Sequence, residues 1–424
     1  MGIFSLAVNR ATGSFADKIV TNDERPVSSQ TSSAKPDVSR KAPKPASADL
    51  KIDILQNIPD MQAFESQWRK LEETAAKPSN VFQSYDWCYN WAQTCTIDND
   101  CYSLNIVTIS RNDECLLIWP MMTTCVGPFC VLRWLSDPYS QYGDVLVADN
   151  PEKDSLLELA WHELKTLPGA DSIRLRHVRH DANVHSFLTR NTKNDGTCDY
   201  APFLEIDKFP TQAAYDTRYS KSQRRRRKRI RTSLSQHGEI IFTHASKGEQ
   251  FDHSLDRAII EKRQWLNQRG LHSKPLQGDE LGAFFHALAE NGKTLKPLAS
   301  QLNSGEQEIS YEIGLRYKNY HFGYLTAHDN SLTDASPARL HMDMSQRLAI
   351  DDGMKAFDLM VPADPHKKTW SSASVETADY FIPTNAKGAL YTLVYLQILR
   401  PLVRTIYKTV SPKVRRHITR WVQP

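Results

Sequence analysis

The stretch from Ser336 to Met360 has residue types and spacing that suit the binding of an anion. It follows a strand-like run that ends near His328, and it opens with Ser336 and Pro337, a dipeptide typical of helix starts. The first backbone N–H groups of a helix have no partner within the helix, and the helix dipole places partial positive charge beside them. A strand, a short loop and a helix start in this order therefore predict a site for a phosphate or pyrophosphate group.

A second candidate for anion binding is a dense run of cations that the sequence predicts to be helical. Such a run is a good electrostatic footprint for nucleic acid. On a helix, however, the cations spread over all faces, and no aromatic residues are interleaved to stack on bases. A solvated helix that lines a cleft and attracts phosphates is therefore the interpretation we favour. The basic residues are Lys221, Arg224, Arg225, Arg226, Arg227, Lys228, Arg229 and Arg231.

A loop between two predicted strands, SDPYSQYGDVLVAD, is crowded with Asp137, Tyr139, Tyr142 and Asp144. Loops on a rigid scaffold often supply polar groups to a substrate cleft. The composition fits an ordinary turn equally well, so both interpretations stay open.

The candidate residues lie in two successive blocks of the sequence, each with a pattern of alternating helices and strands. At 424 residues the chain is too long for one ordinary core. We predict an α/β chain with two domains, residues 51–207 and 211–385, each a central mixed sheet flanked by helices. The two blocks share an order of elements but no literal sequence repeat. The second block is expected to hold helices near 251–268 and 279–290 and strands at 308–317 and 320–328.

The composition, 40% hydrophobic and 24% charged, is that of a globular protein. No apolar run approaches the roughly 20 residues of a membrane-spanning helix, and no signal-peptide core is visible, so we expect a cytoplasmic protein. Residues 1–48, rich in Ser, Pro, Ala and Lys, predict a disordered leader. All seven cysteines lie between Cys88 and Cys198, without a C-x-x-C pair or a His cluster. We therefore expect reduced thiols, no disulfide and no metal.

The segment 386–424 predicts a basic amphipathic helix, because the chain carries no acidic residue after Asp379. Attachment to an anionic membrane surface is one interpretation. Docking on its own domain or on a partner protein is an equal alternative. The apolar face would consist of Leu399, Leu402, Val403, Ile406 and Val410.

The chain contains, in this order, the motifs FQSYDWCYNW, DPYSQYGDVL, YSKSQRRRRKRIRTSL followed by HGEI, LTAHDNSLTDASPARLH, and FDLMVPADPHKKTW. Together they resemble the CelD-like (BioF-type) acyltransferase family of the GNAT superfamily, over about Ile52 to Tyr380. That family is similar to the FemAB peptidoglycan aminoacyl transferases. The resemblance implies two tandem GNAT-like domains, acyl-CoA (acetyl-CoA) as co-substrate, and a bacterial role in exopolysaccharide, cellulose, capsule or envelope synthesis.

The resemblance also implies where the co-substrate binds. The pantetheine arm would run along the strand 320–328, which includes Leu325, and the pyrophosphate would lie at the amides of Ala338 and Arg339. The Arg339 guanidinium can add a charge-assisted contact to a phosphate. Ala338 departs from the family pattern, in which Gly usually follows this Pro, and His366 stands where Tyr is usual.

Asp358 and Lys367 match an Asp and a Lys that are characteristic of the family. We predict that Lys367 contacts an anion or the oxyanion that develops during acyl transfer. Asp358 orients Lys367, acts as the base, or is a buried structural carboxylate.

A sugar, an amine or a polysaccharide precursor is the expected acceptor, bound between the two halves. Residues 137–144 would form one wall of this cleft, and Lys221, Arg225 and Trp265 the other. Two alternatives stay open: aminoacyl transfer from tRNA, as in the FemAB relatives, and a catalytically degenerate scaffold for a polysaccharide synthase. The expected location is the cytoplasm, at the inner face of the membrane.

Overall fold

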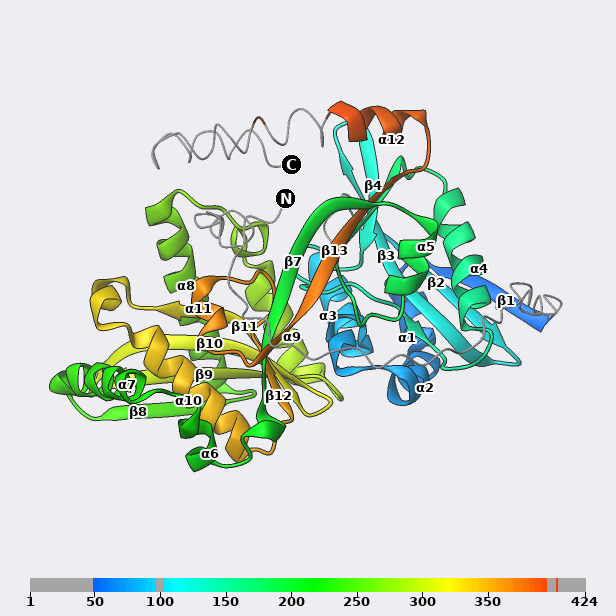
Figure 1. Cartoon of the computed structure of the whole chain (residues 1–424). Helices are drawn as coiled ribbons and strands as arrows, with labels where there is room; N and C mark the ends of the chain where they lie inside the picture. The colour runs from blue at the N-terminus through cyan, green and yellow to red at the C-terminus, as the bar shows by residue number, and fades with distance from the viewer. Residues whose placement is uncertain (1–48, 97–101, 395–401, 403–424) are drawn as a thin grey trace, which may run out of the picture.

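The computed structural model describes residues 49–96, 102–394 and 402, and these residues are organised around a 13-stranded mixed sheet (Figure 1). The strand order is β1-β2-β3-β4-β6-β13-β7-β12-β11-β10-β9-β8, with β5 beside β3. Two neighbouring pairs are parallel, β4 with β6 and β11 with β12, and the others are antiparallel. This arrangement is the predicted mixed α/β class.

The first half follows the predicted order of elements. A β-hairpin in this half has its two-residue turn at Asn112 and Asp113. Both residues have positive φ, which such a tight turn requires. The elements are β1 (Leu50–Leu55), α1 (Ile58–Ala63), α2 (Glu65–Ala75), α3 (Tyr85–Cys95), β2 (Tyr102–Arg111), β3 (Glu114–Val126), β4 (Phe129–Trp134), β5 (Leu146–Val147), α4 (Lys153–Thr166), β6 (Ser172–Arg179), α5 (His185–Asn191) and β7 (Asn194–Glu205).

The second half begins beyond β7, and the predicted basic helix is its α7. A capping box starts this helix: the Ser220 hydroxyl oxygen accepts the Gln223 backbone N–H, and the Gln223 side chain accepts the Ser220 backbone N–H. The elements are α6 (Gln212–Thr217), α7 (Lys221–Leu234), β8 (Ile240–Ala245), α8 (Glu249–Arg269), α9 (Glu280–Asn291), β9 (Lys296–Ser304), β10 (Gln307–Tyr317), β11 (Tyr320–His328), α10 (Pro337–Asp351), β12 (Ala356–Asp358), α11 (Pro365–Lys368), β13 (Ala373–Pro383) and α12 (Ala386–Tyr391).

The two halves exchange strands at the centre of the sheet. β13, the last strand of the second half, lies between β6 and β7 of the first, with Tyr380 opposite Leu175. β7 in turn pairs with β12, with Phe203 opposite Asp358. Figure 1 shows β7 and β13 as long neighbouring strands that run between the two halves. The halves therefore share backbone hydrogen bonds as well as side-chain contacts.

Apolar packing between α3 and α9 also joins the halves. Trp87 is fully buried, and its ring lies 4.7 Å from that of Phe284 in an edge-to-face arrangement. The Trp87 indole N–H donates to the Ser136 hydroxyl at 2.7 Å. Trp91, one turn further along α3, is fully buried as well. The aromatic residues at helical spacing are thus core residues.

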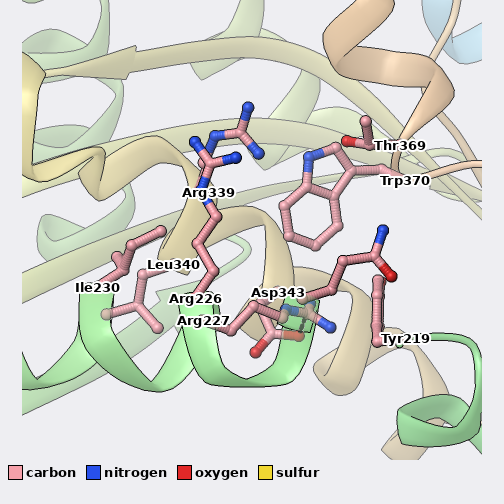
Figure 2. A pocket seen from close by; sticks show the side chains of 10 residues that line it. Tyr219, Arg226, Arg227, Ile230, Arg339, Leu340, Asp343, Thr369 and Trp370 are labelled. Atoms are coloured by element: carbon pink, nitrogen blue, oxygen red, sulfur yellow. Dashed lines mark hydrogen bonds and ion pairs between the residues drawn. The ribbon is translucent and has the colours of Figure 1, made fainter. Parts of the chain in front are cut away.

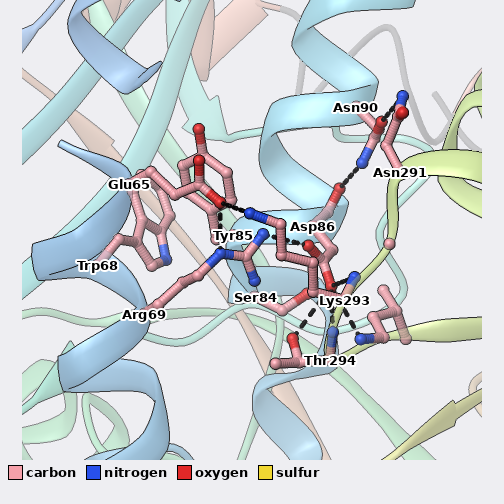
Figure 3. A network of polar contacts seen from close by, with 12 residues as sticks. Glu65, Trp68, Arg69, Ser84, Tyr85, Asp86, Asn90, Asn291, Lys293 and Thr294 are labelled. Atoms are coloured by element: carbon pink, nitrogen blue, oxygen red, sulfur yellow. Dashed lines mark hydrogen bonds and ion pairs between the residues drawn. The ribbon is translucent and has the colours of Figure 1, made fainter. Parts of the chain in front are cut away.

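The carboxylate of Asp86 at the start of α3 fastens the loop between α9 and β9 (Figure 3). One of its oxygens accepts the backbone N–H groups of Lys293, Thr294 and Leu295 at 2.7–2.9 Å, and the other accepts from Arg69 at 2.5 Å. Burial alone would raise the pKa of Asp86, but Arg69 and the loop amides outweigh it and lower the pKa. An ionised, fully paired carboxylate therefore links the halves.

The prediction that the cysteines form no disulfide is wrong for one pair. Cys125 and Cys130 are bonded across the β3–β4 hairpin, where they are cross-strand partners with Cα atoms 4.0 Å apart. A search for C-x-x-C spacing misses them, because here a turn at Gly127 returns the chain over five residues. Of the other described cysteines, three are buried thiols and Cys198 is exposed.

The predicted leader, residues 1–48, and nearly all of the predicted tail helix lie outside the described residues. Within the part of the chain that the structure describes, no helix combines the length and apolar character needed to cross a membrane. α12, at the start of the predicted tail, leaves Leu390 exposed.

Replacing Asp86 by Ala should lower the free energy of unfolding by about 3–5 kcal/mol, because the Arg69 cation and the loop amides lose a buried partner. Urea titration followed by circular dichroism measures this change. Asp154→Ala, which removes an exposed ion pair with Arg190, is the control and should barely move the midpoint. Equal midpoints for the two variants would contradict the assigned role of Asp86.

Candidate active site

The site begins where β11 and β12 separate. These parallel strands pair only from Tyr320 opposite Ala356 to Phe322 opposite Asp358, after which β12 ends and β11 continues to His328. On its other edge, β11 bulges at Tyr324, where the register with β10 shifts. No other described strand pairs with the edge of β11 that β12 leaves. No described strand therefore covers this edge of β11 from Gly323 onward, and apart from the Thr326 carbonyl oxygen, which accepts from Lys262, its backbone groups can meet a ligand with amide groups.

A cavity of about 410 Å³ lies against this open edge. Its walls come from β11, α8, the start of α10, and the segment from the end of β12 into α11. Leu325, Ala338, Trp265 and Lys367, four of the residues predicted from the sequence, line it together. The volume is in the range of small-molecule sites.

Lys367 is held by the short helix α11, whose N-cap Asp364 accepts the Lys367 backbone N–H at 2.7 Å. Its ammonium group donates to the carbonyl oxygens of Met360 at 3.0 Å and Val361 at 3.3 Å. An ammonium group has three donors, so one N–H is left for a ligand in the cavity. Burial lowers the pKa of Lys367 to about 8, against the opposing effect of Asp364 and Asp358.

Lys262, on α8, shares the cavity with Lys367 and was missed by the sequence analysis. Its ammonium group donates to the carbonyl oxygen of Thr326 on β11 at 3.0 Å. Burial, and then the positive charge of Lys367, lower its pKa to about 8. The sequence offers one sign that Lys262 belongs to the site: it lies one helical turn before Trp265, which was predicted as a site residue.

Two histidines line the same cavity, His328 at the end of β11 and His366 in α11. Burial lowers the pKa of both, and nearby cations lower it further: Lys262 for His328, and Arg339 for His366. Both imidazoles are therefore mainly neutral at neutral pH and can accept a proton. His366 Nε2 accepts a long hydrogen bond of 3.4 Å from the Trp370 indole.

The start of α10 lies against the cavity, where the Arg339 backbone N–H already donates to the Ser336 carbonyl oxygen at 3.0 Å. The N-cap Ser336 has a positive φ of 57° and makes no capping hydrogen bond through its side chain. Pro337 is the first helical residue, where its missing N–H costs nothing. Ala338 lines the cavity, and Arg339 points into an adjoining one (Figure 2). The local geometry fits an anion, as the sequence predicts.

Asp358 lies behind the cavity and does not line it. Only 3% of the residue is exposed, and its carboxylate accepts from Tyr142 at 2.7 Å, Arg179 at 3.1 Å and the Met360 backbone N–H at 2.7 Å. Burial raises the pKa of Asp358, and Arg179 and Tyr142 oppose that effect. Met360 in turn accepts from Lys367, so the contacts are those that the predicted orienting role of Asp358 requires, and that role stays a prediction.

The loop 137–144 packs inside the protein instead of forming a wall of the cleft. Asp137 is buried beside Arg133 and Arg176; burial would raise its pKa, but Arg176, Arg133 and Arg174 lower it to about 2. Asp144 accepts from Asn80, Asn183 and Val184. Tyr139 is also buried, and its carbonyl oxygen accepts from Tyr324 at 3.0 Å. These polar groups are internally paired, which their composition does not reveal.

Lys221 and Arg225, proposed for the other wall, are exposed on α7 and line none of the cavities found in the described residues. Two of their neighbours in the basic run, Arg226 and Arg227, line the cavity shown in Figure 2. The orientation of α7 against α10 decides which of the basic residues line a cavity. The sequence does not reveal this orientation, because the cations lie on all faces of the helix.

The comparisons with known proteins agree with this geometry. Residues 221–368 match the family model described as an acetyltransferase (GNAT) domain. These residues are a GNAT domain. They extend from α7 through α11 and contain the splayed strands, the start of α10 and Lys367, so the predicted assignment to the transferases is confirmed. No curated protein matches the sequence.

The fold beyond the GNAT domain also has relatives among solved structures. The crystal structure of FemX is similar with a TM-score of 0.54 and 11% identity, over 81% of this chain and 99% of that chain. A tandem GNAT protein from the clavulanic acid biosynthesis pathway has a TM-score of 0.47 and 9% identity, over 80% and 99%. The likeness to FemX spans both halves and confirms the predicted fold class.

Lys262 and Lys367 should be reactive amines, because at pH 8 about half of each is neutral, whereas an ordinary lysine has a pKa of about 10.4. Competitive labelling read by mass spectrometry should give midpoints near pH 8 for both in the folded protein and ordinary midpoints in urea. Lys367→Met should raise the midpoint of Lys262, since it removes a neighbouring cation. If both lysines titrate at about pH 10.4 in the folded protein, the lowered pKa values assigned to Lys262 and Lys367 are wrong.

Proposed function

We propose that the chain is an acyl-CoA-dependent N- or O-acyltransferase. The observation that carries this proposal is the opening of the unpaired edge of β11 and the uncapped start of α10 onto the same cavity. An extended arm with amide groups fits the strand edge, and a pyrophosphate fits the helix start. Acyl-CoA has both features in one molecule.

The co-substrate, when bound, supplies an activated thioester. The acceptor forms the new bond to the acyl carbon, the C–S bond breaks, and CoA leaves as a thiol after taking up a proton. The chain then has to stabilise negative charge on the acyl oxygen and remove a proton from the acceptor. The spare N–H of Lys367 supplies the charge-assisted contact, held in place by Met360 and Val361. His328 is a neutral base within the cavity and takes the acceptor proton, whereas the acceptor nitrogen of His366 is occupied by the Trp370 indole N–H.

The acceptor and the cellular role rest on the resemblance to the CelD-like family. We propose a sugar, an amine or a polysaccharide precursor as acceptor, in exopolysaccharide, cellulose or envelope synthesis at the inner face of the membrane. Trp265 is half-buried in the cavity wall, where Lys262 and Arg269 both lie over its ring.

Aminoacyl transfer from tRNA is the second candidate. The fold shared with FemX and the exposed cations of α7 favour it. Calorimetry separates the candidates: acetyl-CoA should bind the full chain, and tRNA should not. Salt-sensitive tRNA binding with no heat from acetyl-CoA at millimolar concentration would replace the first proposal by the second. A folded chain that binds neither would favour the degenerate scaffold.

Lys367→Met should reduce kcat for acetyl transfer by roughly 10²–10³, the usual cost of losing one oxyanion donor. Lys368→Met is the matched control, since the next residue of α11 is exposed and lies outside the cavity. Acetyl-CoA turnover measured by thiol release compares the two variants. Equal rates would exclude Lys367 from the reaction.

The rate should fall as the pH rises through about 8, because Lys367 is then deprotonated and no longer carries a positive charge. The group is protonated below its pKa, so activity is retained on the acid side of this limb. Lys367→Arg should move the limb to higher pH, because the guanidinium stays charged. If the fall in rate stays at the same pH in Lys367→Arg, a group other than Lys367 causes it.

A further inference from the structure

A second, smaller cavity of about 150 Å³ adjoins the GNAT cleft on the other side of the α10 start (Figure 2). It is lined by one face of α7, namely Gln223, Arg226, Arg227 and Ile230, which follow helical spacing. Arg339 contributes from α10. The volume is below that of sites for drug-sized ligands, so the cavity fits one small group of a larger molecule.

Arg227 forms the floor of this cavity and is already neutralised. Its guanidinium pairs with Asp343 and lies 3.7 Å from the Tyr219 ring centroid and 4.8 Å from that of Trp370. These contacts fix its position by a salt bridge and by cation–π attraction. Arg227 is therefore held in place, while its Nε and Nη1 donors have no partner among the residues that the structure describes and its carboxylate partner Asp343 is shared with Arg347.

Arg226 and Arg339 supply positive charge for a ligand at the mouth of the cavity. Figure 2 shows their guanidinium groups next to each other, and after burial the charge of Arg226 lowers the pKa of Arg339. No ion pair joins either group to a carboxylate among the side chains that the structure describes. Two neighbouring cations repel each other, and an anion between them removes that repulsion. Planar guanidinium groups suit a tetrahedral phosphate particularly well.

The small cavity and the proposed donor site have no lining residue in common, but consecutive residues of α10 and of the segment 366–370 line one or the other. Ala338 lines the large cavity and Arg339 the small one; likewise His366 and Lys367 line the large cavity, and Thr369 and Trp370 the small one. A donor whose pyrophosphate lies at the start of α10 therefore has its nucleotide end beside Arg226 and Arg339.

We propose that Arg226 and Arg339 bind a phosphate monoester on the nucleotide end of the acyl donor, and that this contact selects donors that carry it. The inference rests on the proposed acyl-CoA function and adds to it a specificity determinant in α7. It also assigns a role to one member of the basic run while its other exposed members remain solvated.

Calorimetry of the full chain with CoA and with 3′-dephospho-CoA tests the proposal, since the two probes differ only in that phosphate. CoA should bind roughly tenfold to a hundredfold more tightly, the range expected for charge-assisted hydrogen bonds. Arg226→Gln should weaken CoA binding and leave 3′-dephospho-CoA binding unchanged, so that the ratio falls towards one. Arg226 is exposed, and thermal unfolding confirms that the variant folds.

Lys228→Gln is the matched control, because it removes one positive charge from an exposed position on the opposite side of α7 and should keep the ratio. Equal affinities of the wild type for both probes would overturn the inference and leave the donor proposal standing. If neither probe binds the folded chain, the donor proposal fails and the inference fails with it. An equal loss in Arg226→Gln and Lys228→Gln would show general electrostatic attraction and also overturn the site.

Discussion

The geometry of the GNAT cleft depends on the buried carboxylate of Asp358. A buried charge is unfavourable unless it is fully paired, and here the first half of the chain supplies two of the partners, Tyr142 and Arg179. The third partner, the Met360 N–H, belongs to the turn whose carbonyl groups hold Lys367. One side chain thus joins the halves and contacts the turn that holds the Lys367 ammonium group.

The sheet makes the same connection through its backbone. β12 lies between β7 of the first half and β11 of the second, and its early end at Asp358 leaves the edge of β11 open towards the cavity. Asp86 of the first half also links the two halves, because its carboxylate holds the loop before β9 of the second half.

The cleft and the small cavity beside it gather cations that have few carboxylate partners. After burial, the charge of Lys367 lowers the pKa of Lys262, and the charge of Arg226 lowers the pKa of Arg339. The packing of α7, α8, α10 and α11 imposes this repulsion, which a bound polyanion offsets. A site built in this way favours a donor that carries several phosphate groups over a neutral one.

Much of the fold was predictable because its elements are encoded locally. Periodicity locates β10, β11 and α10, and Ser336-Pro337 marks the helix start that faces the cleft. Lys262 and Arg179 could not be found, since a lysine or arginine within an amphipathic element gives no sign of what its charge faces. The loop 137–144 was wrongly expected to face a ligand. Its polar residues have partners inside the protein, and their composition is the same as that of a loop that faces a ligand.

The sequence by itself determined the order of helices and strands, the Ser-Pro start of α10 and the match of residues 221–368 to a GNAT domain, because each depends on neighbours along the chain. Only the tertiary structure decided that β13 inserts between β6 and β7, and that Arg226, and not Lys221 or Arg225, faces a cavity. Strand pairing across some two hundred residues and the rotation of α7 against α10 are set by packing between distant segments, and a local pattern does not contain that information.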